Sequence, residues 1–220
     1  MAIESYIGAT ILTNPSTPES NSPPVRAAKL KTLIQHALEA GATRASAIST
    51  NDISVENNLA DMCREPRCKC YGLSTSCPPH VTGPTGFRKL LKNFSRAVFF
   101  KIDVPSEILF SSDRREIFQL LHEISSGIER KAVKMGFLNA RAYAGGSCKQ
   151  IFCYDYSDCR VLSENRKCRN PHVARPSMSG FGINVARLIK TARWNKTQTS
   201  TNDEAKPTKM TGVYGLVLIY

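Results

Sequence analysis

The chain has 220 residues, which suits one domain that can bury a core without disulfide bonds. Hydrophobic residues make up 41% and charged residues 22%, which excludes a disordered or fibrous protein. Its apolar runs are too short to cross a bilayer, and the formal net charge of +12 indicates anionic partners or bound anionic groups.

The N-terminal segment, residues 1–23, is rich in Pro, Ser, Thr and Asn and has no Lys or Arg. We expect a flexible tail there and one domain over residues 24–220. The segment carries Glu4 and lacks a basic stretch and a cleavage site, so we expect no secretion signal. This favours a cytoplasmic protein with reduced cysteines and no membrane insertion.

Helix and strand patterns alternate along this domain. Leu30, Leu33 and Ala37 recur at helical spacing before Gly41, and the continuous run AVFFKI predicts a strand covered on both faces. Helices are predicted over 24–41, 84–94, 113–136 and 183–193, and strands over 44–49, 96–103, 138–144 and 212–219. A polar stretch at 195–209 is expected to be a mobile loop. The pattern predicts an α/β fold whose sheet, mixed or parallel, has about four strands with flanking helices.

The eight cysteines form two groups separated by some seventy residues. The first group has the spacing C-x4-C-x-C-x6-C over 63–77, and the second C-x4-C-x5-C-x8-C over 148–168. Each group follows a Gly-capped helix and a strand, which indicates an internal duplication. If both strands belong to one sheet, both cysteine-rich loops leave carboxyl ends, where ligands bind in open α/β sheets. We therefore expect two neighbouring metal sites.

Four thiolates suit either zinc or an iron–sulfur cluster. Zinc ribbons pair cysteines two to four residues apart, whereas the uneven gaps here suit a cluster in which each iron takes one sulfur. The favoured cofactor is therefore an iron–sulfur cluster of the 4Fe–4S type, with zinc as the alternative. The ligands predicted in the second group are Cys148, Cys153, Cys159 and Cys168.

The first group contains one awkward gap, because Cys68 and Cys70 are one residue apart. We assign Cys63, Cys68 and Cys77 as ligands and treat Cys70 as the spare cysteine. The fourth ligand is then Cys70, His80, water or a substrate, and an open position is what a catalytic metal site requires.

Three further residues are candidates for contact with a cofactor. Gly145 and Gly146 would let the backbone turn closely around a cluster. Arg175, before a Gly-rich turn and a helix, could hold an anion. No motif identifies a catalytic residue.

Three segments together resemble a known family: YGLSTSCPP at 71–79, GGSCKQIFC at 145–153 and CRNPHVARPSMSGFGINV at 168–185. They are similar to a domain-of-unknown-function family described as predicted metal-binding proteins of bacteria and archaea. The resemblance covers about 28–220 and implies metal binding through the cysteines, with no agreed reaction. Many relatives have C-x2-C-x2-C after GG-x-C, where this chain has Ile151 and later cysteines, and Cys70 has no counterpart.

Three functions follow from these patterns. The first is electron transfer, or an accessory role in anaerobic redox or cofactor metabolism, with a redox partner protein. The second is a structural-zinc protein whose basic face binds RNA or another polyanion. The third is an enzyme with an open metal site at the first cysteine group. We favour the first, because no nucleic-acid-binding motif accompanies the basic residues.

Overall fold

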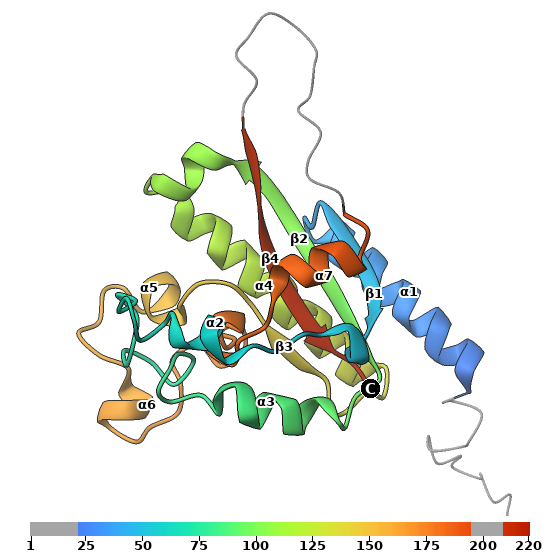
Figure 1. Ribbon diagram of the computed structural model, residues 1–220, viewed down its shortest axis with the longest axis horizontal. Coiled ribbons are helices and arrows are strands. Elements are labelled where there is room, and N and C mark those ends of the chain that lie inside the picture. The colour runs from blue at the N-terminus through green and yellow to red at the C-terminus, as the bar shows by residue number, and fades with distance from the viewer. Residues whose placement is uncertain (1–21, 195–208) are drawn as a thin grey trace, which may run out of the picture.

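The computed structural model describes residues 22–194 and 209–220 (Figure 1). Most of the predicted tail at 1–23 and of the predicted loop at 195–209 lies outside these residues. The elements, with 3-10 helices labelled η, are α1 (Pro23–Glu39), β1 (Arg44–Ser49), η2 (Thr50–Asp52), α2 (Asn57–Asp61), α3 (Gly83–Leu91), β2 (Arg96–Pro105), η3 (Ser106–Phe110), α4 (Arg114–Lys134), β3 (Arg141–Tyr143), α5 (Cys148–Phe152), α6 (Arg160–Ser163), η4 (Met178–Phe181), α7 (Val185–Thr191) and β4 (Met210–Leu218).

The predicted α/β fold with four strands and flanking helices is confirmed. The strand order is β1-β2-β4-β3, with the long strands β2 and β4 in the centre. The chain contains the same order of elements twice: a helix, an edge strand, a cysteine group, a short helix and a central strand. This is the order that led us to expect a duplication. No helix within 22–194 or 209–220 is long and apolar enough to span a bilayer.

The strand directions differ from the mixed or parallel sheet that we expected, because all three neighbouring pairs are antiparallel. Ser49, at the end of β1, lies opposite Arg96, at the start of β2. The connection between these strands, whose last helix is α3, therefore starts and finishes at the same end of the strands. Two neighbouring strands that are connected at the same end run antiparallel.

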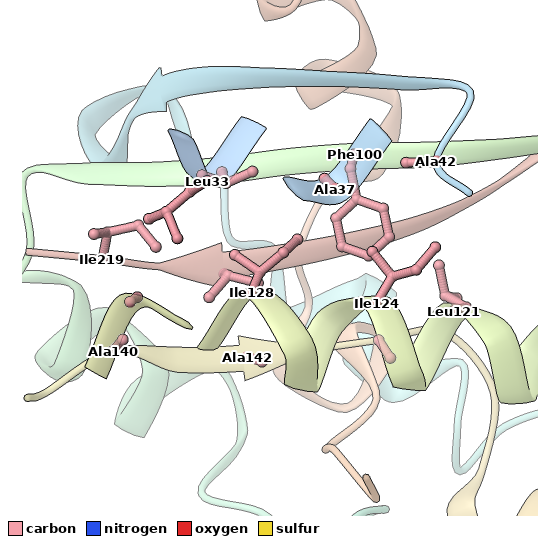
Figure 2. Packing of buried hydrophobic residues seen from close by; sticks show 14 of the residues in the cluster. Leu33, Ala37, Ala42, Phe100, Leu121, Ile124, Ile128, Ala140, Ala142 and Ile219 are labelled. Atoms are coloured by element: carbon pink, nitrogen blue, oxygen red, sulfur yellow. The ribbon is translucent and has the colours of Figure 1, made fainter. Parts of the chain in front are cut away.

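Both faces of the sheet are covered, because alternate residues of the central strands enter two different cores. On one face, Val98 and Phe100 pack with α1 and α4 (Figure 2). On the other face, Ala97 and Phe99 pack with residues of α3, η4 and α7. This explains the continuous apolar run in β2, which is buried from Ala97 to Ile102.

One glycine of β4 is required by packing. A Cβ added at Gly215 would lie 2.3 Å from the Phe100 ring and 2.9 Å from the Ser125 hydroxyl. Since Phe100 is fully buried, it has no free space into which to move. The absence of a side chain at Gly215 thus makes room for the Phe100 ring of β2 and lets α4 pack closely against β4.

Candidate metal centre

The structure has two neighbouring pockets, and each is lined by the cysteines of one group. The larger pocket has a volume of about 610 Å³ and is lined by all four cysteines of the first group, the first thiol set: Cys63, Cys68, Cys70 and Cys77. The smaller pocket, of about 20 Å³, is lined by all four of the second group, the second thiol set: Cys148, Cys153, Cys159 and Cys168. All eight cysteines are free thiols.

The two thiol sets meet, but not for the reason expected from the sequence. In an antiparallel sheet, β1 and β3 run in opposite directions, so their carboxyl ends do not lie at one edge. Instead, the segment after β1 crosses toward η4, where Val55 and Ile183 form an isolated bridge and Glu56 N–H donates to Gly182 O. This crossing carries the first cysteine group to the second.

The ARPSM segment, residues 174–178, lies between the two cysteine groups in space and joins them through its backbone. Met178 N–H donates to Ala144 O at the end of β3, and Ala144 N–H donates to Pro176 O. Ser177 N–H donates to Ser76 O in the first group. The segment therefore holds both cysteine-rich loops against the sheet.

A serine lies where the two thiol sets approach each other. The Cys77 thiol of the first set donates to Ser147 Oγ at 3.4 Å, and Ser147 directly precedes Cys148 of the second set. From the other side, Ser74 and Ser76 of the first loop lie close enough to the Cys148 thiol to lower its pKa, although burial raises that pKa overall. The two pockets thus share a wall of hydroxyl groups.

Several donors in the second pocket point at sulfur or have no other partner. Asn170 donates twice, from its backbone N–H to Cys168 Sγ at 3.3 Å and from Nδ2 to Cys153 Sγ at 3.4 Å. The buried Ser74 hydroxyl lines this pocket and makes no hydrogen bond of ordinary length with the described residues. Such donors stabilise thiolate and tune metal groups bound by sulfur. Sequence reasoning missed Asn170, whose only signal was its place between Cys168 and a proline.

Three of the eight thiols are held in their neutral form by their surroundings. Burial is the main cause that raises the pKa of Cys63 and Cys148, and it raises the pKa of Cys70 to about 11. Neighbouring cysteines add to the effect, since two thiolates in one pocket would repel each other. A metal that binds here must therefore displace protons from the thiols.

The other candidate residues have different places. His80 is exposed and outside both pockets, with Nε2 3.3 Å from Gly72 O. Gly146 lines the larger pocket, and its positive φ and the nearby Phe118 ring leave little room for a side chain. Gly145 also packs against Phe118 and accepts a hydrogen bond at its carbonyl.

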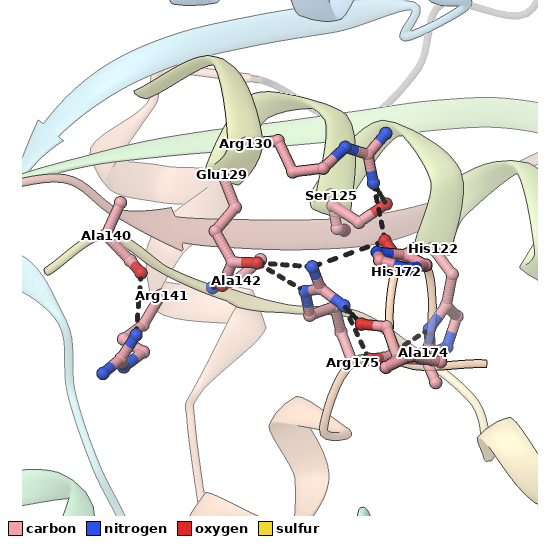
Figure 3. A network of polar contacts seen from close by, with 12 residues as sticks. His122, Ser125, Glu129, Arg130, Ala140, Arg141, Ala142, His172, Ala174 and Arg175 are labelled. Atoms are coloured by element: carbon pink, nitrogen blue, oxygen red, sulfur yellow. Dashed lines mark hydrogen bonds and ion pairs between the residues drawn. The ribbon is translucent and has the colours of Figure 1, made fainter. Parts of the chain in front are cut away.

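Arg175 lies outside both pocket walls, and its guanidinium is occupied by protein acceptors (Figure 3). It pairs with the Glu129 carboxylate, with Nε 2.7 Å from Oε2, and donates to the carbonyls of Pro171, His172 and Ala174. Through the pair with Glu129, Arg175 holds the turn that precedes Ser177 against helix α4.

A buried histidine connects the same helix to both ends of the second cysteine-rich loop. His122 is fully buried on α4, with Nε2 3.1 Å from Gly145 O, and its Nδ1 accepts from Arg175 N–H at 3.1 Å (Figure 3). Because Nδ1 accepts, the ring proton belongs on Nε2, and the neutral ring satisfies both contacts. Burial lowers the pKa of His122 to about 4.

The donor set fits a thiolate-bound group, but the thiols do not converge on one point. Within 22–194 and 209–220, no group of three or more His, Cys, Asp or Glu side chains could hold a metal ion as it stands. What fits is the grouping of four soft ligands around each pocket and the N–H donors on sulfur.

Comparisons with known proteins agree with this chemistry at the level of the family. Neither a curated protein nor a solved structure matches the chain. A family model described as "Predicted metal-binding protein (DUF2284)" matches residues 46–219, which include both thiol sets and the whole sheet apart from Arg44 and Ala45 at the start of β1. The chain therefore belongs to this family of predicted metal-binding proteins.

Proposed function

We propose that each thiol set holds an iron–sulfur cluster, of the 4Fe–4S type, and that the protein transfers electrons in the reducing cytoplasm. The observation that carries the proposal is the pairing of each pocket with the four cysteines of one group. A bound cluster would supply one-electron redox chemistry, and this chain's residues would hold it, shield it and set its potential.

The spread of the thiols favours a cluster over a single zinc ion. Tetrahedral zinc requires four sulfurs about 2.3 Å from one point. A cluster takes one sulfur at each iron and so accepts ligands around a larger object. The first thiol set lines a cavity much larger than one ion, and the Asn170 donors on Cys153 and Cys168 are hydrogen bonds of the kind that tune cluster potentials.

For the first pocket we now propose Cys70 as the fourth ligand. Its side chain is buried and lines the pocket with Cys63, Cys68 and Cys77, whereas the alternative ligand, His80, lies outside the pocket. The backbone N–H of Cys70 is 3.5 Å from Cys68 Sγ, a turn that brings these two thiols to the same pocket despite the single residue between them.

The proximity of the two sets supports electron transfer between them. Cys77 and Cys148 belong to different sets, yet both lie beside the serines of the shared wall. Cys68 of the first set is exposed and gives a route to a redox partner protein at the surface.

Nucleic-acid binding is less well supported, because aromatic rings near the cysteines are covered by arginine. The guanidinium of Arg115 lies 3.9 Å from the Tyr154 ring centroid, and that of Arg169 lies 4.0 Å from the Tyr156 centroid. One face of each ring is therefore occupied by a guanidinium and is not available to stack on a base.

Anaerobic purification followed by iron, acid-labile sulfide and zinc analysis tests the proposal. We expect iron and sulfide in equal amounts, a broad visible absorption, and an electron paramagnetic resonance signal after reduction. Cys70→Ser and Cys159→Ser should each remove iron, and His80→Ala is the control that should leave it unchanged. Stoichiometric zinc without sulfide would refute the redox function, and unchanged iron in Cys70→Ser would refute the fourth ligand.

A further inference from the structure

Most of the wall of the larger pocket is not cysteine. The volume of about 610 Å³ falls in the range of small-molecule sites, about 300–1,000 Å³. Beyond the first thiol set, the wall is built by the start of α4, by α2, by α5 and by the segment that leads into α7. A cluster held by the four thiols would occupy one end of this cavity.

The charged part of this wall is cationic. Arg114 and Lys69 line it, and none of its described lining residues is a carboxylate. The Arg114 guanidinium lies 5.3 Å from the Phe118 ring centroid and has no carboxylate partner among the described residues. A cation without a counter-ion at the mouth of a cavity attracts anions.

Polar groups inside the pocket also lack protein partners. Ser177 is only 8% exposed, yet its hydroxyl, which lines the pocket, makes no hydrogen bond to a described residue. The side-chain amide of Gln150 on α5, an exposed residue of the same wall, makes no hydrogen bond within the described chain either. Polar groups of a cavity wall that have no protein partner are available to a ligand or to ordered water.

Another part of the wall is apolar, with Leu59 of α2, Met62 directly after α2, and Ile183 and Val185 before and at the start of α7. Met62 is 60% exposed and thus leaves apolar surface at the cavity uncovered by the protein. An apolar wall with a few convergent polar groups is typical of sites for organic molecules.

We propose that this pocket binds a small organic anion with an apolar body, its acidic group at Arg114 and its body along the α2 and α7 wall. The proposal deepens the proposed function, on which it rests for the metal group beside the bound molecule. Binding itself depends on the protein wall and can be measured whatever the metal content.

Equilibrium dialysis of the full chain, purified anaerobically, tests the site with naphthalene-2-sulfonate as probe and the neutral naphthalene-2-sulfonamide as its isostere. The anion should bind at least tenfold more tightly than the amide. Arg114→Gln should weaken anion binding about tenfold, the loss of one charge-assisted contact, and leave the amide unaffected. Arg115→Gln is the matched control, because Arg115 neighbours Arg114 but lies against Tyr154 outside the pocket.

The outcomes separate this inference from the cluster proposal. Equal binding of the two probes, no binding, or equal losses in both arginine variants would overturn the anion site, even in a protein that contains iron and sulfide. An Arg114-dependent preference in a protein that holds only zinc would support the site and refute the clusters. Both substitutions are on exposed side chains, and circular dichroism of each variant confirms that it is folded.

Discussion

The buried His122 should make the protein sensitive to acid in a way that one substitution can isolate. In the folded chain the neutral ring bridges Gly145 and Arg175, and burial lowers its pKa from 6.5 to about 4. In the unfolded chain the ring takes up a proton near its ordinary pKa. Unfolding therefore binds a proton between these two values, and the folded state loses stability as the pH falls from about 6.5 to about 4.

The size of this loss follows from the difference between the two pKa values. Each pKa unit corresponds to about 1.4 kcal/mol, so the shift from 6.5 to about 4 implies a loss of about 3 kcal/mol at pH 4 relative to neutral pH. For a domain whose total stability is about 5–15 kcal/mol, this is a large fraction. At pH 7 and above, His122 is neutral in both states and its stabilising contribution is fully present.

Urea unfolding at neutral pH and near pH 4, with metal content measured in each sample, gives the loss directly. His122→Gln removes the titration and keeps a donor, so its stability should fall about 3 kcal/mol less over this range than that of the wild type. His80→Gln is the control, because the His80 side chain is exposed. Equal acid dependence in wild type and His122→Gln would refute the reasoning.

Three further substitutions test the packing and the metal sites. Asn170→Ala removes the side-chain donor to Cys153 Sγ and should lower metal affinity about 10-fold or more. Competition with a chelator measures this affinity, and an unchanged value would show that the amide does not act on the bound group. Glu129→Gln leaves the guanidinium of Arg175 buried without its carboxylate and should cost about 3 kcal/mol in urea unfolding, a result contradicted by a loss below 1 kcal/mol. Gly215→Ala should cost about 2 kcal/mol or more, because its methyl group collides with Phe100, and a melting temperature equal to that of the wild type would contradict this.

Secondary structure with a clear period was predictable from the sequence. The strand predicted at 44–49 matches β1, and the helix predicted at 113–136 contains α4. The short helices α2, α5 and α6 were missed because four or five residues inside the cysteine-rich loops carry no recognisable period. The strand predicted at 138–144 is shortened to β3, since Ala140 N–H donates to Phe137 O in a turn.

The proximity of the two cysteine groups was predicted, but its geometry was not. The relative direction of two strands depends on the end of the sheet to which their connection returns. Nothing in the sequence shows that residues 50–95, which connect β1 to β2, return to the end at which β1 finishes. Likewise, the Glu129–Arg175 pair joins positions 46 residues apart, so an arginine that suggested an anion site from its local sequence has a protein partner instead.

The two hydrophobic cores on the sheet contain no cysteine: none of the eight belongs to either cluster of buried apolar residues. The free energy that holds α1, α4 and the four strands together therefore does not depend on metal. Loss of metal should release the cysteine-rich loops by local opening, with rapid amide hydrogen exchange there and slow exchange in β2 and β4. Insertion of the metal group can then follow folding of the sheet, as the final step in maturation of the protein.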